Sequence, residues 1–328
     1  MTITENEFEI TSIQVQKVEE LIQKHKRDAP DFYDEGESEI FYVPVEDGEI
    51  RVFHHKPKKI LTKRPILFIP GFGTTPWTWR QFHHTHHGYA EYYHLETRDK
   101  KSNRIRRQRK VNFTVDQIAK DIAKVIKFTG LDKCDYVLMA ACMTGGAILQ
   151  GLIKGYFKPP TAIVFDPFVE WKQNRALVRI VMPVLPPAVL GAIKFLIGKV
   201  VMANMKNEAQ KERNMDTIDA AIPWIWRKFS LQNINYNLTK NLREIKDQVF
   251  VFHGPKDKYH PEGTFQNIAR SIPNGRFFYM NTANENREYL AGAIGTSFAY
   301  KTKEDGIPPE LELYEIKLKR NAPISPKI

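Results

Sequence analysis

Cysteine is scarce in this chain: only Cys134 and Cys142 occur among its 328 residues. Two cysteines cannot supply the disulfide framework on which small secreted domains depend. The first ten residues, MTITENEFEI, are acidic and lack the apolar core of a secretory signal. These absences argue against export, and we expect a protein that folds in the reducing cytoplasm.

Long uninterrupted apolar runs are also missing. The most apolar stretch, residues 176–203, is broken by three prolines and by Arg179, Lys194 and Lys199. A membrane-spanning helix needs about 20 consecutive apolar residues, so this stretch is not predicted to cross a membrane. The sequence has no internal repeat and no low-complexity tract, which indicates that most of it folds. Its length suits one α/β core with an insertion.

Positive charge is in excess, with 49 Lys and Arg against 38 Asp and Glu, and this balance favours anionic partners. Much of it lies in residues 98–110, where the candidate anion-binding residues are Arg104, Arg106, Arg107 and Arg109. A solvated loop is the alternative. The run lacks interleaved aromatic residues, which argues against nucleic acid. Together with the nearby apolar stretch, it favours acyl-CoA or peripheral contact with an anionic membrane.

Strand and helix patterns alternate along most of the chain. Extended runs at 39–45 and 49–55 flank a turn and predict an antiparallel hairpin. Further strands are predicted at 65–70, 91–97, 135–140, 162–166, 248–254 and 276–280, and helices at 12–26, 115–128, 145–154, 261–271 and 287–294. The helix at 115–128 begins with a capping box at Thr114 and ends at Gly130. This alternation predicts a mostly parallel sheet with helices on both faces.

The same pattern divides the chain into five segments. A helical extension (1–38) precedes the first part of the core (39–166). A helical cap (167–235) interrupts the strand rhythm before the second part of the core (236–298) and a C-terminal arm (299–328). Residues 310–319 alternate imperfectly, which indicates an added edge strand or an extended arm.

The order of these elements and three short motifs resemble the α/β-hydrolase superfamily over residues 39–298. The motifs are Pro70-Gly71-Phe72-Gly73 after one strand, the run from Ala140 to Gly146 after another, and the sequence QVFVFHGPKDKYHPEG (248–263). The resemblance implies a twisted, mostly parallel sheet with an inserted helical cap. It also implies an oxyanion hole formed by the backbone amides of Phe72 and Met143.

The position of the nucleophile depends on how the turn is counted. The family carries G-x-S-x-G there. Counting from the strand places Cys142 at the nucleophile, but it places β-branched Thr144 where glycine is expected. Counting back from Gly145 selects Met143, whose thioether is not a nucleophile. Cys142 is favoured because strand length is harder to change than one glycine, and a buried core cysteine is the alternative.

The acid and the base of the family's triad differ in how well they match. The resemblance places the acid at Asp257, but no histidine follows His260, so the usual position of the base is unfilled. Without an imidazole the mechanism lacks its general acid and base, and His260 is the possible substitute. Residues 83–87 (HHTHH) have spacings that suit a metal or a base. The run holds no carboxylate or cysteine, so we predict a solvated face, no metal and no cofactor.

Trp224 and Trp226 are candidates to line an apolar substrate pocket, although such residues more often pack a cap onto its core. Two functions follow. The first is a cysteine-dependent acyl hydrolase or acyltransferase acting on an apolar ester or thioester, which Asp257 and Gly71 favour. The second is an inactive hydrolase-fold protein that binds an apolar ligand, an anionic membrane surface or a protein partner. The missing histidine and Thr144 favour this second function.

Overall fold

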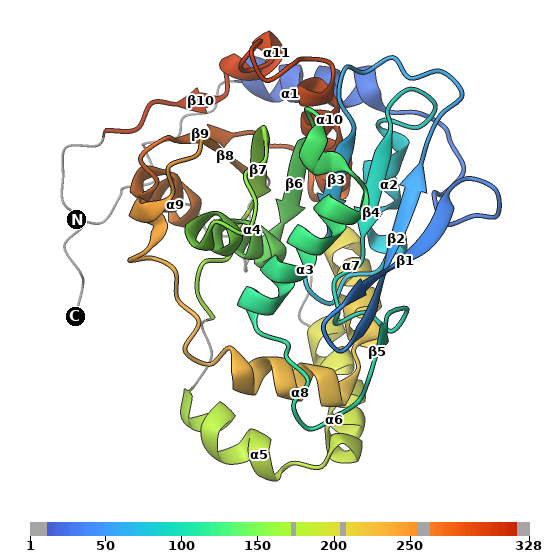
Figure 1. Cartoon of the computed structure of the whole chain (residues 1–328), viewed down its shortest axis with the longest axis vertical. Helices are drawn as coiled ribbons and strands as arrows, with labels where there is room; N and C mark the ends of the chain where they lie inside the picture. The colour runs from blue at the N-terminus through green and yellow to red at the C-terminus, as the bar shows by residue number, and fades with distance from the viewer. Residues whose placement is uncertain (1–11, 172–174, 204–207, 255–262, 320–328) are drawn as a thin grey trace.

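A ten-stranded mixed sheet runs through the centre of the computed structural model, which describes residues 12–171, 175–203, 208–254 and 263–319. The strand order is β1-β2-β4-β3-β6-β7-β8-β9-β10, with β5 paired to β2 (Figure 1). The strands are β1 (Glu39–Val45), β2 (Gly48–His55), β3 (Ile66–Ile69), β4 (Tyr92–Leu95), β5 (Arg104–Ile105), β6 (Val137–Ala141), β7 (Thr161–Phe165), β8 (Val249–His253), β9 (Gly275–Tyr279) and β10 (Glu315–Ile316). The six neighbouring strands β4, β3, β6, β7, β8 and β9 are parallel to one another. The predicted mostly parallel sheet is therefore confirmed.

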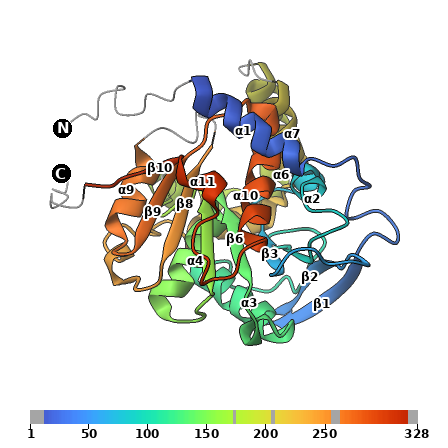
Figure 2. The same cartoon turned by 90° about the horizontal axis from the view of Figure 1, so that it is seen from above.

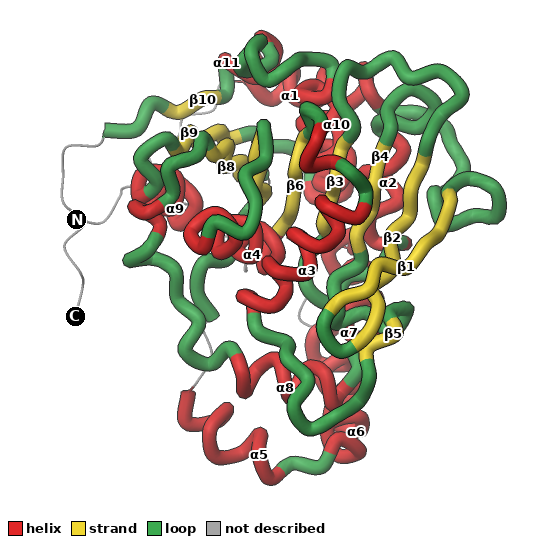
Figure 3. Tube along the Cα trace, viewed as in Figure 1, coloured by secondary structure: helices red, strands yellow, loops and turns green. Residues whose placement is uncertain are grey.

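Helices cover both faces of this sheet, as Figures 2 and 3 show. They are α1 (Ser12–His25), α2 (Arg80–His84), α3 (Val115–Phe128), α4 (Cys142–Lys154), α5 (Met182–Val184), α6 (Pro187–Ala203), α7 (Glu208–Ala220), α8 (Pro223–Gln232), α9 (Thr264–Ser271), α10 (Arg287–Ala299) and α11 (Pro309–Glu312). Helices α3, α4 and α9 pack on one face, and α1, α2 and α10 pack on the other. The two faces therefore bury two separate hydrophobic cores.

Strand β6 shows how one apolar run serves both cores. Successive side chains of a strand point to opposite faces. Leu138 and Ala140 accordingly belong to the core under α3 and α4, whereas Val137, Met139 and Ala141 belong to the core under α10. A strand buried on both sides reads as a continuous apolar run. This is why the central strands could be predicted from hydrophobicity alone.

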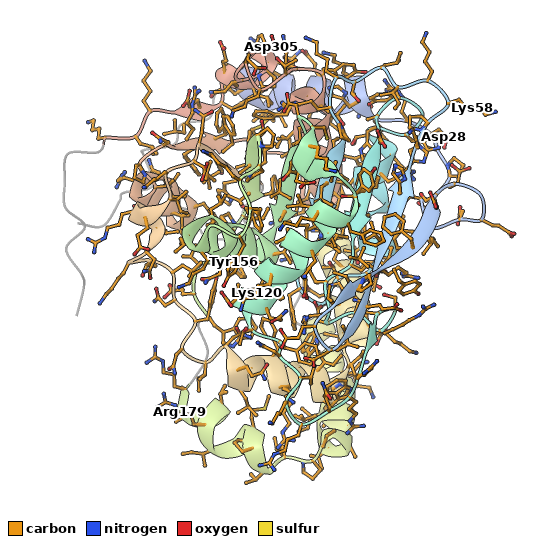
Figure 4. All side chains as sticks on the ribbon, viewed as in Figure 1. Asp28, Lys58, Lys120, Tyr156, Arg179 and Asp305 are labelled. Atoms are coloured by element: carbon orange, nitrogen blue, oxygen red, sulfur yellow. The ribbon has the colours of Figure 1, made fainter. Side chains whose placement is uncertain are left out.

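Helix α3 begins and ends where its sequence signals indicate. The Thr114 side chain accepts a hydrogen bond from the backbone N–H of Gln117. Gly130, two residues beyond the helix, has a left-handed backbone with φ of 74°. On the outer side of this face, the Lys120 ammonium lies 5.6 Å from the centre of the Tyr156 ring (Figure 4). The capping residues thus determine the bounds of α3.

Both ends of the described chain pack onto the core. Val18, Leu21 and Ile22 of α1 are buried in the core beneath α10. Strand β10 pairs antiparallel with β9 through Glu315 and Ile316. The predicted edge strand is therefore present, although it is only two residues long.

The inserted segment (residues 167–235) lies between β7 and β8 and carries α5 to α8 at one end of the sheet (Figure 1). Within the described ranges, no single helix is long and apolar enough to cross a membrane. One pair, Val178–Val184 and Pro187–Val200, meets the length and composition criteria jointly but is bent by 108°. Ile180, Val184, Leu196 and Val200 of this pair are between 60% and 76% exposed. The segment thus presents apolar side chains to the surroundings.

Candidate active site

Cys142 occupies the turn between β6 and α4 in a strained backbone conformation. It is the first residue of α4, and its φ is 57°. Among the described residues, only Asp47 and Asp166 share a positive φ without being glycine. Such a conformation costs about 1 to 3 kcal/mol and persists only where the surrounding structure imposes it. Met143, the other candidate for this position, has its side chain buried in the core.

Thr144 holds this turn against the loop that follows β3. Its Oγ1 lies 2.9 Å from the Pro70 carbonyl oxygen, 3.1 Å from that of Ile69 and 2.7 Å from that of Ala141. A hydroxyl donor can be shared among acceptors arranged in this way. The β-branched residue that departs from the family pattern therefore bonds the two loops together.

Two glycines after Thr144 allow α4 to approach the next loop. A Cβ on Gly145 would lie 3.0 Å from the Pro167 Cβ, and a Cβ on Gly146 would lie 2.1 Å from the Phe168 carbonyl oxygen. Close approach between backbones is the usual reason for glycine at such positions. The family pattern has a glycine at position 144. In this chain, Gly145 and Gly146 instead allow the close approach.

The loop after β3 lies directly beside Cys142. A Cβ on Gly71 would be 3.3 Å from the Cys142 Cβ. Phe72 is the next residue of this loop, and Met143 is the second residue of α4, where N–H groups have no partner within the helix. Both amides that the sequence assigned to an oxyanion hole therefore belong to segments that meet at Cys142.

A buried ion pair between Lys100 and Asp99 holds the loop after β3. The Lys100 ammonium donates to the Gly71 carbonyl oxygen and to Asp99 Oδ2, both at 2.9 Å. Asp99 Oδ2 also accepts from the Gly73 backbone N–H at 2.9 Å. Lys100 and Asp99 are 7% and 4% exposed. The basic run at 98–110 is thus not entirely a solvated loop, because its first part supports residues 71–73.

Asp166 is the centre of a second buried polar network. It follows β7 with φ of 48° and is fully buried. Its Oδ1 lies 2.5 Å from His253 Nδ1 at the end of β8, and its Oδ2 accepts a hydrogen bond from Arg287 Nη2. Arg287 is the first residue of α10, after the last parallel strand. Where the resemblance implies a histidine, an arginine reaches a carboxylate, and guanidinium does not deprotonate in proteins.

A cavity of about 430 Å³ brings these segments together. Helix α7 and Trp226 of the inserted segment form one side of it, and the turn at Cys142 and the start of α10 form the other. Its lining residues are Gly71, Phe72, Thr74, Thr78, Trp79, Ala141, Cys142, Phe168, Gln210, Arg213, Asn214, Thr217, Ile218, Trp226, Arg287 and Glu288. A thiol, two guanidinium groups and a carboxyl group therefore share one largely apolar cavity.

Glu288 is the acidic group of this cavity. It is 4% exposed, and Arg213 of α7 donates to its Oε2 at 3.3 Å. Arg213 also donates to the Asn284 carbonyl oxygen at 2.9 Å. Burial raises the pKa of Glu288, while Arg213 and Arg287 oppose that shift. The protonated carboxyl group is thus more favoured here than in water.

The other predicted site residues separate into two groups. Trp226 lines the cavity, and its ring centre is 5.6 Å from that of Phe72. Trp224 instead packs 5.6 Å from Phe113 and lies beneath the Arg107 guanidinium at 5.5 Å. Arg104 forms an ion pair with Glu49 at 3.0 Å, whereas Arg106 and Arg109 are exposed. Asp257 and His260 lie outside the described residues.

The predicted solvated histidine face is wrong. His83 of α2 and His86 of the turn that follows it are 0% exposed, because α2 packs against α10 and both rings lie beside Tyr92 of β4. The His86 and Tyr92 ring centres are 4.3 Å apart. The spacing within the run was visible in the sequence, but the burial of that helix face was not.

Sequence reasoning did not identify Arg213, Arg287 or Glu288 as site residues. Arg287 and Glu288 did carry a signal, since they open a helix that has no other charged residue (REYLAGAIGTSFA). Arg213 lies in a helix rich in charged residues (EAQKERNMDTIDA), where nothing distinguishes it from its neighbours. Its position in the cavity depends on how α7 packs.

Comparison with known proteins was informative only at the level of structure, because no family model and no curated protein matches the sequence. A thermophilic esterase from Thermogutta terrifontis superposes with a TM-score of 0.60 at 17% identity, covering 80% of this chain and 96% of that one. A bromoperoxidase from Bacillus anthracis has a TM-score of 0.57 at 14% identity, with 78% and 97% covered. A bacterial membrane phospholipase A has a TM-score of 0.54 at 13% identity, with 82% and 84% covered.

Proposed function

Given that this chain has the α/β-hydrolase fold, we propose that it is an acyltransferase or acyl hydrolase in which Cys142 attacks an apolar thioester or activated ester. The observation that carries the proposal is the position of Cys142. It lies on a strained strand-to-helix turn, at the wall of a cavity of about 430 Å³. A strained residue persists only where the surrounding structure holds it, and such residues cluster at functional sites.

The first step is attack of the Cys142 thiolate on the carbonyl carbon of the substrate. A helix N-terminus favours a thiolate, and Cys142 is the first residue of α4. A bond forms between Sγ and the carbonyl carbon, and the negative charge moves to the carbonyl oxygen, toward the amides of Phe72 and Met143. The tetrahedral intermediate then expels the leaving group with its electron pair, which leaves an S-acyl cysteine.

The arginine in place of the family's histidine favours a thioester over an ordinary ester. An alkoxide leaving group needs a proton as it departs, and an imidazole normally donates it. A thiolate leaving group, derived from a thiol with a pKa near 8.5, departs without one. Acylation by a thioester can therefore proceed without the imidazole that protonates an alkoxide leaving group.

Release of the acyl group places a different demand on the site. Water or an alcohol must lose a proton as it attacks the S-acyl cysteine. Glu288 lines the cavity, and burial raises its pKa, so it is our candidate to exchange that proton. We expect release to be slower than acylation, because the imidazole that normally serves as the base has no counterpart at its usual position. A positioned base typically contributes about 10²- to 10⁴-fold to the rate.

The lining of the cavity suits an apolar acyl chain. The large apolar side chains among its lining residues are Phe72, Trp79, Phe168, Ile218 and Trp226. Its volume lies within the range of about 300 to 1,000 Å³ that is usual for small-molecule sites. The acyl group would lie along these side chains, with its carbonyl carbon next to the thiol.

The test is covalent trapping with a short acyl thioester such as hexanoyl-CoA. Intact-mass measurement should show one hexanoyl adduct on the native chain, and peptide mapping should place it on Cys142. Cys142→Ala should abolish the adduct, and the matched control Cys134→Ala should leave it unchanged. Glu288→Gln should retain the adduct but prolong its lifetime. An adduct on Cys134, or no adduct at all, would reject Cys142 as the nucleophile.

A second candidate function is ligand binding without turnover. It is favoured by the ion pair between Arg287 and Asp166, since both carboxylate oxygens of Asp166 already take part in hydrogen bonds. In that case, apolar ligand should copurify with the protein equally in native and Cys142→Ala forms. No covalent adduct would form in either.

Contact with an anionic membrane is a further part of the proposal. The helix pair of α5 and α6 exposes apolar side chains, and the basic loop packs against α8 through Lys228, which donates to the carbonyl oxygens of Gln108 and Arg109. Arg179 marks the same end of the molecule in Figure 4. Helix α8 also packs against α5 and α6. The exposed apolar side chains and the loop with Arg106, Arg107 and Arg109 therefore surround one helix, and this arrangement matches the apolar and charged layers of a lipid surface.

Vesicle binding tests this contact. Each Lys or Arg near an anionic surface contributes about 1 kcal/mol, so replacing Arg106, Arg107 and Arg109 with Gln should weaken binding to phosphatidylserine vesicles about 100-fold. The matched control replaces the exposed Lys56, Lys58 and Lys59; Lys58 is labelled at the opposite end of the molecule from Arg179 in Figure 4. Equal weakening by both triple variants would show that net charge alone causes the attraction.

A further inference from the structure

Three imidazoles converge where the end of β2 meets α2. One ring nitrogen from each of His55, His83 and His87 lies within 4.8 Å of the other two. The ring centres are 5.0 Å apart for His55 and His83, 4.9 Å for His55 and His87, and 5.2 Å for His83 and His87. His83 lies in α2, His87 lies four residues later in the turn that follows this helix, and His55 comes from a strand about 30 residues earlier in the chain.

The buried nitrogens of this cluster lack hydrogen-bond partners. His83 is 0% exposed, and neither its Nδ1 nor its Nε2 has a partner. His55 is 6% exposed, and its Nε2 also has none. An unsatisfied buried polar group costs about 1 to 3 kcal/mol. Such groups are rare in native proteins and call for a physical explanation.

Glu37 orients the two outer imidazoles. Nδ1 of His55 donates to the Glu37 carbonyl oxygen at 2.7 Å, so Nε2 is the nitrogen that could bind a metal. Nε2 of His87 lies 2.9 Å from the Glu37 carboxylate, so Nδ1 is the nitrogen that could bind a metal. Histidines that bind a metal typically donate their second ring nitrogen to a carbonyl or carboxylate oxygen in this manner.

We propose that His55, His83 and His87 bind a Zn²⁺ ion through one nitrogen each, with Glu37 as the group that orients two of them. Neutral imidazole is the form that coordinates metal.

The ligand type and geometry favour zinc. Three imidazoles without a thiolate suit zinc and its first-row neighbours, whereas Mg²⁺ and Ca²⁺ prefer oxygen ligands. With Zn–N bonds of about 2.0 to 2.1 Å, a tetrahedral site places its nitrogens about 3.3 Å apart. The nitrogens here lie within 4.8 Å, so small ring rotations bring them to that separation. The His87 side chain is 24% exposed, which leaves solvent access for a fourth ligand.

The site is separate from the Cys142 cavity and does not rest on the proposed function. None of the three histidines is among the described residues that line that cavity. Bound zinc would link the loop at Glu37, the end of β2 and α2. We therefore expect it to stabilise this part of the fold and to take no part in acyl transfer.

Zinc titration of the full-length, chelator-treated chain tests the proposal. We expect one Zn²⁺ per chain by elemental analysis and a rise in the thermal midpoint on the order of 5 °C at saturating zinc. His87→Gln, at a partly exposed position, should weaken zinc binding at least about 100-fold, and Glu37→Gln should weaken it about 10-fold. The matched control is His84→Gln, which removes a neighbouring histidine that is bonded to Asp31 and lies outside the cluster.

Substoichiometric binding by the native chain would overturn the proposal. Equal zinc binding by the native, His87→Gln and His84→Gln chains would also overturn it, because the metal would then bind elsewhere. Co²⁺ provides an independent measurement: a visible absorption band typical of tetrahedral nitrogen coordination should appear in the native chain and in His84→Gln. Its presence in His87→Gln would exclude His87 as a ligand.

Discussion

The two cysteines of this chain differ in backbone conformation and in surroundings. Cys134 is exposed, yet desolvation and the nearby carboxylates of Glu91, Asp135 and Asp132 raise the pKa of its thiol. Cys142 is less exposed, but it begins a helix, where the backbone N–H groups favour a thiolate. Greater exposure would make Cys134 the more reactive cysteine, whereas a larger thiolate fraction would make Cys142 the more reactive one.

We predict that thiolate fraction decides and that Cys142 reacts faster. Iodoacetamide at neutral pH should alkylate Cys142 before Cys134, as measured by peptide mapping over a time course. The physical reason is that the thiolate, and not the thiol, is the nucleophile. Equal rates, or faster labelling of Cys134, would mean that the strand-to-helix turn does not activate its thiol.

At the scale of elements, the close packing between α4 and the loop after β7 depends on a glycine. A Cβ at Gly146 would lie 2.1 Å from the Phe168 carbonyl oxygen and 2.4 Å from the Tyr236 hydroxyl oxygen. The first of these atoms belongs to the backbone and cannot move away without shifting the loop. Helix α4 and the loop must therefore separate if any side chain is introduced.

Gly146→Ala should lower the free energy of unfolding by about 1 to 3 kcal/mol or more, as overpacking of a core does. The matched control is Gly191→Ala in α6, where the nearest atom to a new Cβ is Pro223 Cγ at 3.9 Å. That change should be neutral or stabilising by up to about 1 kcal/mol, because alanine favours helix more than glycine does. Urea denaturation of both variants measures the difference, and similar losses would contradict the close approach at position 146.

At the scale of the whole molecule, buried histidines make the fold sensitive to acid. Burial, together with Lys24 and Arg27, lowers the pKa of His25 from 6.5 to about 4, while Glu310 opposes the shift. Burial also lowers the pKa of five further histidines, which are His55, His83, His84, His86 and His94. The folded structure therefore favours the neutral form of each of these rings.

The sign of the pH effect follows from these directions. Between pH 6.5 and about 4, His25 binds a proton in the unfolded chain but not in the folded chain. Stability is therefore complete above pH 6.5 and is lost as pH falls, by about 3 kcal/mol for this residue near pH 4. Urea unfolding with chelator present should give a midpoint that falls steadily from pH 7 to pH 5. His25→Gln should flatten that slope, and an unchanged slope would show that His25 is not buried in its neutral form.

The sequence by itself determined where most strands and helices lie along the chain and that the sheet is mostly parallel. Its apolar runs have the length and continuity of strands buried on both faces, and Thr114 and Gly130 mark the bounds of α3, so these elements are encoded locally. The strand pattern also led to Cys142 for the turn after β6, where the structure has this residue with φ of 57°. The roles of Asp257 and His260 remain predictions from the sequence.

Only the tertiary structure decided which polar groups meet. Asp166 pairs with His253 and Arg287 across 87 and 121 residues of sequence, and His55 at the end of β2 joins His83 of α2 and His87 of the turn that follows α2. Such contacts depend on the order of strands in the sheet and on the helix face that is turned inward. Hydrophobic periodicity indicates that a segment is buried, but it does not indicate which segment it packs against. The reason is that the buried strands of one sheet share the same apolar pattern.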